Sequence, residues 1–215
     1  VGSMMRFWFL FTVGCGSEPA TTKSDAAEES FPSDFLWGTA TSGFQVDMGC
    51  PTWTAAECDD PASDWYQWVT DQNIIASSNL FVSGEPVSAG PGMWELFESD
   101  VEQMAVDGMT AYRFSLEWSR LFPDGGAEEA TSVEELSVHV NQDAVDRYHE
   151  MFTALAAANI EPLVTLNHYT MPLWVHNGVA CHDDRDTCEA DGWVNRERIT
   201  RLIGLYAGYA GREFG

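Results

Sequence analysis

The sequence predicts an α/β fold with parallel strands, closed as a barrel rather than laid out as an open nucleotide-binding sheet. Short apolar segments alternate with longer amphipathic ones, and this order implies right-handed crossovers between parallel strands. In chain order the predicted strands and helices are 35–41, 93–108, 111–118, 145–158, 162–168 and 195–214. No glycine-rich phosphate loop follows any of these strands, which disfavours the doubly wound alternative.

The first strand ends in residues suited to a functional site. Phe35–Trp37 is a short apolar run that passes into small residues up to Gly43, a pattern that predicts a buried strand. Gln45 and Asp47 project from its carboxyl end, where barrel enzymes keep their active sites. The alternative is a core strand that simply enters a turn.

The second strand, 111–118, carries Arg113 among apolar neighbours. A guanidinium in such a strand is costly unless it meets a carboxylate. Two explanations stay open. Arg113 forms a structural salt bridge, or it holds a catalytic carboxylate ionised, because a nearby cation lowers the pKa of an acid.

The third strand, 162–168, ends at His168 and is followed by Tyr169. A neutral imidazole can donate to or accept from a sugar hydroxyl, and an aromatic face suits the C–H surface of a pyranose. A purely structural histidine is the alternative. Sugar contact and packing are also the two explanations for three tryptophans in the long loop 50–91: Trp53, Trp65 and Trp68.

Composition indicates a globular domain and excludes one class of partner. The 215 residues are 45% hydrophobic and carry 10 basic against 34 acidic side chains, a formal net charge of −24. Nucleic acid is not an expected partner, because such a strong negative field repels phosphate backbones. A solvated acidic surface that favours solubility is the expected explanation of the charge, and a cationic partner is the alternative.

The N-terminal 30 residues differ in character from the rest. Arg6 precedes a short apolar run that ends at Cys15, too short to span a bilayer but suited to an export signal. Residues 1–15 resemble a bacterial lipoprotein signal, in which Cys15 becomes the lipidated end, and 16–30 predict a flexible acidic tether. A disordered tail with an accidental apolar patch is the alternative. We therefore expect an exported protein, periplasmic or at the cell surface, with membrane contact only through this anchor.

The other four cysteines form two close pairs, Cys50 with Cys58 and Cys181 with Cys188. Each pair brackets a short acidic loop, which predicts two local disulfides in an oxidising compartment. Zinc is the competing explanation, kept only because His182 follows Cys181. Neither pair has the C-x-x-C spacing typical of zinc sites, so no metal is expected.

Four segments carry a resemblance to one enzyme family: 35–49, 112–123, 162–174 and 192–196. In order and content they resemble family 1 of the glycoside hydrolases, the β-glucosidase and β-galactosidase family. Glu117 before Trp118, together with 63–69 and 82–84, is similar to the archaeal-type subgroup. The resemblance implies that 31–215 is the N-terminal portion of a (β/α)₈ TIM barrel, about three of its eight βα units.

The resemblance also implies roles for single residues. Four positions match family residues that act on the sugar or on the nucleophile: Gln45, Arg113, His168 and Tyr169. The glutamine and the histidine bind the sugar, the tyrosine flanks it, and the arginine neighbours the nucleophile. Asp47 stands where the family usually has Glu, and Thr170 where an acidic residue is common.

The catalytic carboxyl pair is not recognised within the chain. The family's acid/base lies in an Asn-Glu-Pro motif after the fourth strand and its nucleophile near the seventh; this sequence has no Asn-Glu-Pro. Both are expected beyond Gly215, so the 215-residue chain is expected to be inactive alone. The whole protein is expected to hydrolyse β-linked glycosides or oligosaccharides with retention and without a cofactor. A non-catalytic or decayed sugar-binding protein is the alternative.

Overall fold

The computed structural model describes residues 30–77 and 79–215. The predicted signal 1–15 with Cys15, and the predicted tether except for Ser30, lie outside these residues. The chain divides into two units, Val1–Phe35 and Leu36–Gly215. In the described part of the first, the rings of Phe31 and Phe35 lie 4.6 Å apart. Among the described residues no helix is long and apolar enough to cross a membrane.

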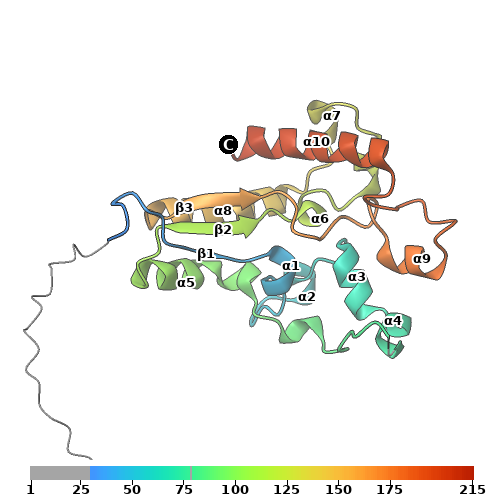
Figure 1. Ribbon diagram of the computed structural model, residues 1–215, viewed down its shortest axis with the longest axis horizontal. Helices are drawn as coiled ribbons and strands as arrows, with labels where there is room; N and C mark the ends of the chain where they lie inside the picture. Colours follow the sequence, from blue (N-terminus) through green and yellow to red (C-terminus); the bar gives the residue numbers. More distant parts are fainter. Residues whose placement is uncertain (1–29, 78) are drawn as a thin grey trace, which may run out of the picture. The chain divides into compact units, whose positions relative to one another are not determined.

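The second unit is built on three parallel strands in the order β1-β2-β3 (Figure 1). They are β1 Gly38–Ala40, β2 Ala111–Ser115 and β3 Glu161–Thr165. Ala111 of β2 pairs with Gly38 on one side and with Glu161 on the other. The predicted order and parallel direction are therefore confirmed. β1 approaches β2 closely because Gly38 has no side chain: a Cβ there would lie 2.6 Å from the carbonyl oxygen of Ala111.

The strands are shorter than the sequence predicts, and β2 shows why. After Ser115 the chain turns into α6, Trp118–Leu121. The carbonyl of Glu117 accepts the backbone amides of Arg120 and Leu121, so the helix captures residues that alternate like a strand. The apolar pattern continues past Ser115 because both elements are buried, and burial alone does not separate strand from helix.

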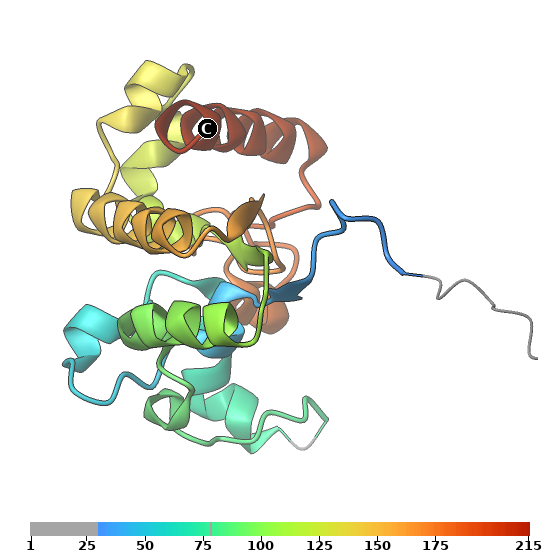
Figure 2. The same cartoon turned by 90° about the vertical axis from the view of Figure 1, so that its left-hand side faces the viewer.

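Three long helices match the predicted ones, and their bounds differ by a few residues. They are α5 Met93–Val106, α8 Gln142–Ala157 and α10 Arg196–Glu213. Asn141 caps α8 by accepting the amide of Asp143, so α8 begins in a polar first turn before its apolar stripe. Figure 2 looks along the strands and shows α5 and α8 on the same side of the sheet.

The core lies between this side of the sheet and the helices. Tyr112 and Phe114 point into it from β2, and the ring of Phe152 on α8 lies 5.4 Å from that of Phe114. On α10, the ring of Tyr206 stacks on Trp118 at 4.8 Å and its hydroxyl donates to the carbonyl of Leu116. The helices thus cover one face of the sheet. The alternate side chains of β2 point to the opposite face.

Short helices fill the loops. Five of them lie between β1 and α5: α1 Gly43–Val46, α2 Ala55–Cys58, α3 Asp64–Thr70, α4 Gln72–Ala76 and the 3₁₀ turn Val87–Ala89. Three more follow later in the chain: the 3₁₀ turn Gly125–Glu129, α7 Val133–Ser137 and α9 Gly178–Asp183. Two of these loops are closed by disulfides. The structure joins Cys50 to Cys58 with Cα atoms 5.8 Å apart, and Cys181 to Cys188 at 4.9 Å.

Candidate active site

The predicted sugar-contact residues follow the carboxyl ends of β1 and β3. Gln45 lies on α1, exposed, and its Oε1 accepts a hydrogen bond from the Ser42 hydroxyl at 2.7 Å. His168 and Tyr169 come just after β3, with ring centroids 5.3 Å apart. Because the strands are parallel, these loops emerge at one edge of the sheet.

A row of aromatic side chains links the two loops. The ring of Phe44 lies 5.9 Å from that of Trp65, which lies 6.3 Å from that of Tyr169. With His168 these residues form what we call the aromatic row. Tyr169 is 69% exposed and has a φ of 72°, a left-handed backbone that is costly for a bulky residue and is found most often at functional sites. Trp65 therefore belongs to the wall beside the predicted sugar contacts.

Arg113 occupies the centre of β2 and points to the face opposite Tyr112 and Phe114, away from the core. It is half-buried, and within the described part of the chain it forms no ion pair. A structural salt bridge, one of the two explanations from the sequence, is therefore not found among these residues. The guanidinium stays available on the inner face of the sheet.

A second group of charged side chains is buried beyond the strand ends. We call it the carboxylate cluster: Asp47, Asp60, Glu117 and Arg120. Arg120 Nε donates to Asp47 Oδ2 at 3.2 Å, and its guanidinium lies 4.0 Å over the ring of Trp94. The Ser119 hydroxyl donates a hydrogen bond to Asp60 Oδ2 at 2.5 Å. One cation therefore faces three buried acids.

This imbalance changes the protonation of the cluster. Burial, followed by the charges of Asp47 and Asp60, raises the pKa of Glu117 to about 8, against the opposing effects of Thr170 and Arg120. Burial also raises the pKa of Asp47 to about 6, although Arg120 opposes it, and raises the pKa of Asp60. At neutral pH Glu117 is thus mainly uncharged. Asp47, in contact with Arg120, is the main anion that pairs with this arginine.

Glu117 connects the cluster to the predicted sugar contacts. The Thr170 hydroxyl donates to Glu117 Oε2 at 2.5 Å, and Asn167 donates its side-chain amide to the carbonyl of Thr170 at 2.9 Å. These bonds fix the loop that presents His168 and Tyr169. Space for the carboxyl group comes from Gly43, where a Cβ would lie 2.3 Å from Glu117 Oε1.

The structure places one sequence-identified residue elsewhere. Asp47 was expected to project with Gln45 from the strand end, but its side chain is 5% exposed and turns to Arg120. An isolated buried carboxylate is costly, and the arginine offsets that cost. No role for Arg120 or Asp60 follows from the sequence. The feature of the sequence that could have indicated Arg120 is that it is a second arginine, directly after an apolar strand.

Two sizeable cavities lie near these groups. One of about 760 Å³ is lined by Asp60, Trp94 and Arg147 on the helix side, and one of about 700 Å³ lies beside α3 and α9. Neither is lined by the four sequence-predicted contact residues, so their convergence in one cavity stays a prediction. In the described part of the chain no three His, Cys, Asp or Glu side chains are grouped to hold a metal ion.

Comparison with known proteins decides the family. The family model for glycosyl hydrolase family 1 matches residues 27–191. The chain belongs to glycosyl hydrolase family 1. A β-galactosidase of Pyrococcus woesei is 32% identical over 204 residues, covering 86% of this chain and 39% of that protein. β-Glucosidase 34 of Oryza sativa subsp. japonica is 32% identical over 202 residues, covering 94% and 32%.

Solved structures of family 1 enzymes share this fold. The β-glycosidase of Thermosphaera aggregans superposes with a TM-score of 0.77 at 29% identity, covering 87% of this chain and 41% of that one. The β-glucosidase of Pyrococcus furiosus gives 0.72 at 26% identity, with 85% and 41% covered. The chain thus spans about two fifths of the archaeal family 1 proteins it matches, and the predicted three βα units of a TIM barrel are confirmed.

Proposed function

We propose that the protein hydrolyses β-O-glycosidic bonds of glucosides or galactosides with retention of configuration. Family membership over most of the chain is the observation that carries the proposal. The arrangement of the described residues supports it. Exposed Gln45 and the aromatic row stand at the carboxyl edge of a parallel sheet, the edge at which barrel enzymes bind substrate.

In this proposal Gln45 and His168 hydrogen-bond sugar hydroxyls, and Tyr169 flanks the ring. Retention requires two carboxyl groups about 5–5.5 Å apart, one an acid/base and the other a nucleophile. We assign both to sequence beyond Gly215. Arg113 then supplies the cation that keeps the nucleophile ionised, since an adjacent positive charge lowers the pKa of a carboxylic acid.

Activity measurements test this assignment. The 215-residue chain should not release nitrophenol from nitrophenyl β-glucoside or β-galactoside. A chain extended through an Asn-Glu-Pro motif and a later nucleophile should do so. In the extended protein, Arg113→Ala should lower kcat, and His168→Ala should lower kcat/KM about tenfold to a hundredfold through lost hydrogen bonds of about 1.5–3 kcal/mol.

His149→Ala is the matched control, because the His149 side chain on α8 is 46% exposed and its Nε2 bonds to Glu213 at 2.9 Å. It should leave kinetics unchanged. Turnover by the 215-residue chain, free of contaminating glycosidase, would place the catalytic pair among its own carboxylates. An extended protein that binds sugars without turnover would favour the non-catalytic alternative.

The export proposal rests on the sequence of residues 1–30. We propose residues 1–15 as a lipoprotein-type signal, 16–30 as a tether, and a periplasmic or cell-surface location for the barrel. Incorporation of labelled palmitate that disappears in Cys15→Ser would support the anchor, whereas an unlabelled cytoplasmic protein would refute it.

A further inference from the structure

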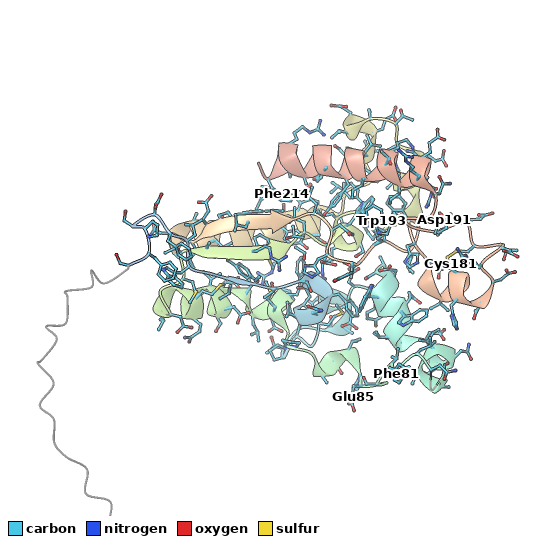
Figure 3. The ribbon with its side chains drawn as sticks, in the orientation of Figure 1. Phe81, Glu85, Cys181, Asp191, Trp193 and Phe214 are labelled. Carbon is cyan, nitrogen blue, oxygen red and sulfur yellow. A yellow bond between two sulfur atoms is a disulfide. The ribbon has the colours of Figure 1, made fainter. Side chains whose placement is uncertain are left out.

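A cavity of about 700 Å³ lies outside the predicted catalytic region, between α3, α9 and residues 80–85. Its walls are mainly apolar and aromatic, with Trp65 and Trp68 on α3 and Phe81 opposite. Figure 3 shows Phe81 and Glu85 on the segment beside α3 and α4, and Cys181 on α9. Pockets of this size and composition, with a few polar groups, are typical of small-molecule sites.

The α3 and α9 walls of the cavity are held in place before any ligand arrives. His182 on α9 meets Trp68 edge-on with centroids 5.5 Å apart. A Cβ on Gly178 would lie 3.4 Å from the ring of Trp68, so α9 lies directly against α3. The Cys181–Cys188 disulfide closes the loop that carries His182. Such preorganisation reduces the entropy lost on binding.

The polar groups of the cavity are also oriented. His176 Nδ1 lies 2.6 Å from Asp64 Oδ2, and the other oxygen of this buried carboxylate accepts the backbone amide of Met171 at 2.9 Å. The histidine side chain is 35% exposed, so its outer edge can reach a ligand. Glu85 supplies an exposed carboxylate on the opposite wall.

Phe81 has no explanation within the fold itself. Its side chain is 93% exposed, and its φ of 53° puts a bulky residue in the left-handed region. This backbone conformation costs of order 1–3 kcal/mol and tends to occur at ligand-binding sites. An exposed phenyl ring at the mouth of an aromatic cavity gains from a ligand that covers it.

We propose that this cavity is a second carbohydrate site, which binds one uncharged pyranose ring of a β-linked oligosaccharide. The faces of Trp65, Trp68 and Phe81 suit the C–H surface of the ring, and the carboxylate and imidazole groups suit its hydroxyls. The net charge of −24 disfavours an anionic ligand. The choice of sugar rests on the proposed function, but the cavity does not.

Trp65 places the second site next to the predicted catalytic one. Its ring belongs to the aromatic row through Tyr169 and also lines the cavity. A sugar in the cavity is therefore separated from the predicted glycone contacts by this indole. An oligosaccharide can meet both sides, and the cavity then favours longer substrates over monosaccharide glycosides.

Saturation-transfer NMR with cellobiose on the 215-residue chain tests the proposal without any turnover. Phe81→Ala should weaken binding about tenfold, the loss expected when an aromatic contact of about 1.5 kcal/mol is removed. Trp68→Ala should do the same. Trp193→Ala is the matched control, since this 55% exposed tryptophan lies before α10, apart from Phe81 (Figure 3). The Phe81-dependent part of this binding should remain in His168→Ala, which removes one of the predicted glycone contacts.

Several outcomes would overturn the proposal. No transfer to cellobiose at millimolar concentration, or equal binding by wild type and Phe81→Ala, would exclude a sugar in the cavity. Binding lost in His168→Ala but kept in Phe81→Ala would assign it to the predicted glycone contacts. Self-association that Phe81→Ala abolishes, without cellobiose binding, would assign the cavity to a second copy of the chain. Phe81-dependent binding together with an inactive extended protein, in contrast, would refute the proposed hydrolase activity and support the second carbohydrate site.

Discussion

Replacing Glu117 by Gln should remove a pH-dependent loss of stability. The Glu117 side chain is buried at 2% exposure among Asp47, Asp60, Arg120 and the ring of Tyr148. Its pKa is raised from 4.5 to about 8, chiefly because burial disfavours the anion. Between these values the unfolded chain releases this proton while the folded chain keeps it. The unfolded state therefore binds fewer protons, and stability falls as pH rises.

The size of the effect follows from the two pKa values. The pKa of Glu117 is 4.5 in the unfolded chain and about 8 in the folded one. The linkage between protonation and folding then lowers the free energy of unfolding by about 4 kcal/mol between pH 4.5 and pH 8. The uncharged amide of Gln does not titrate, and its oxygen can still accept the Thr170 hydroxyl. The stability of Glu117→Gln relative to wild type should therefore increase by about this amount between pH 4.5 and pH 8. Asp47, raised from 3.8 to about 6, keeps a smaller slope of the same sign in both proteins.

Urea unfolding followed by circular dichroism at several pH values measures this difference. Glu102→Gln is the control, because Glu102 lies exposed on α5 and should follow wild type. If Glu117→Gln and wild type lose stability in parallel from pH 4.5 to pH 8, Glu117 is already ionised in the folded chain. Burial without a matched cation would then not be the cause of the pH dependence.

Two further predictions concern packing and covalent links. Gly43→Ala should destabilise the chain by about 1–3 kcal/mol, since the new methyl group meets the Glu117 carboxyl group; urea unfolding measures this, and an unchanged midpoint would contradict the close contact. Non-reducing digestion and mass spectrometry should recover both disulfide-linked peptide pairs, and reduction should cost about 2–3 kcal/mol for each short loop. Four free thiols in the native protein would reject both links and weaken the export proposal.

The sequence predicted the order of the elements because their periodicities are local. The three strands and three long helices follow from apolar spacing alone, and all were found, but β1 is exposed along its length where the apolar run predicted a buried strand. Boundaries were missed where one pattern serves two structures, as at the end of β2, where buried residues continue from the strand into α6. The polar cap and first turn of α8 hide its true start, because apolar spacing becomes visible only at Val145, whereas the predicted start of α10 lies one residue from the observed Arg196.

The candidate site was predicted less completely, because its contacts join distant parts of the chain. Single residues at strand ends could be identified by type, and Gln45 and His168 do follow β1 and β3. The link between Thr170 and Glu117 spans 53 residues, and that between Arg120 and Asp47 spans 73. No local pattern encodes such pairs. Nor did the sequence distinguish a wall tryptophan such as Trp65 from a packed one.

The buried carboxylates bear on which groups can perform the proposed chemistry. Asp47 is engaged by Arg120, and Glu117 is held by Thr170 and is mainly uncharged at neutral pH. A nucleophile must be ionised and must reach the sugar, and these two groups are instead used to fix the loops at the strand ends. Arg113, in contrast, has no carboxylate partner among the described residues and faces away from the core. An unpaired guanidinium on this face is available to a carboxylate, as the role proposed for Arg113 needs.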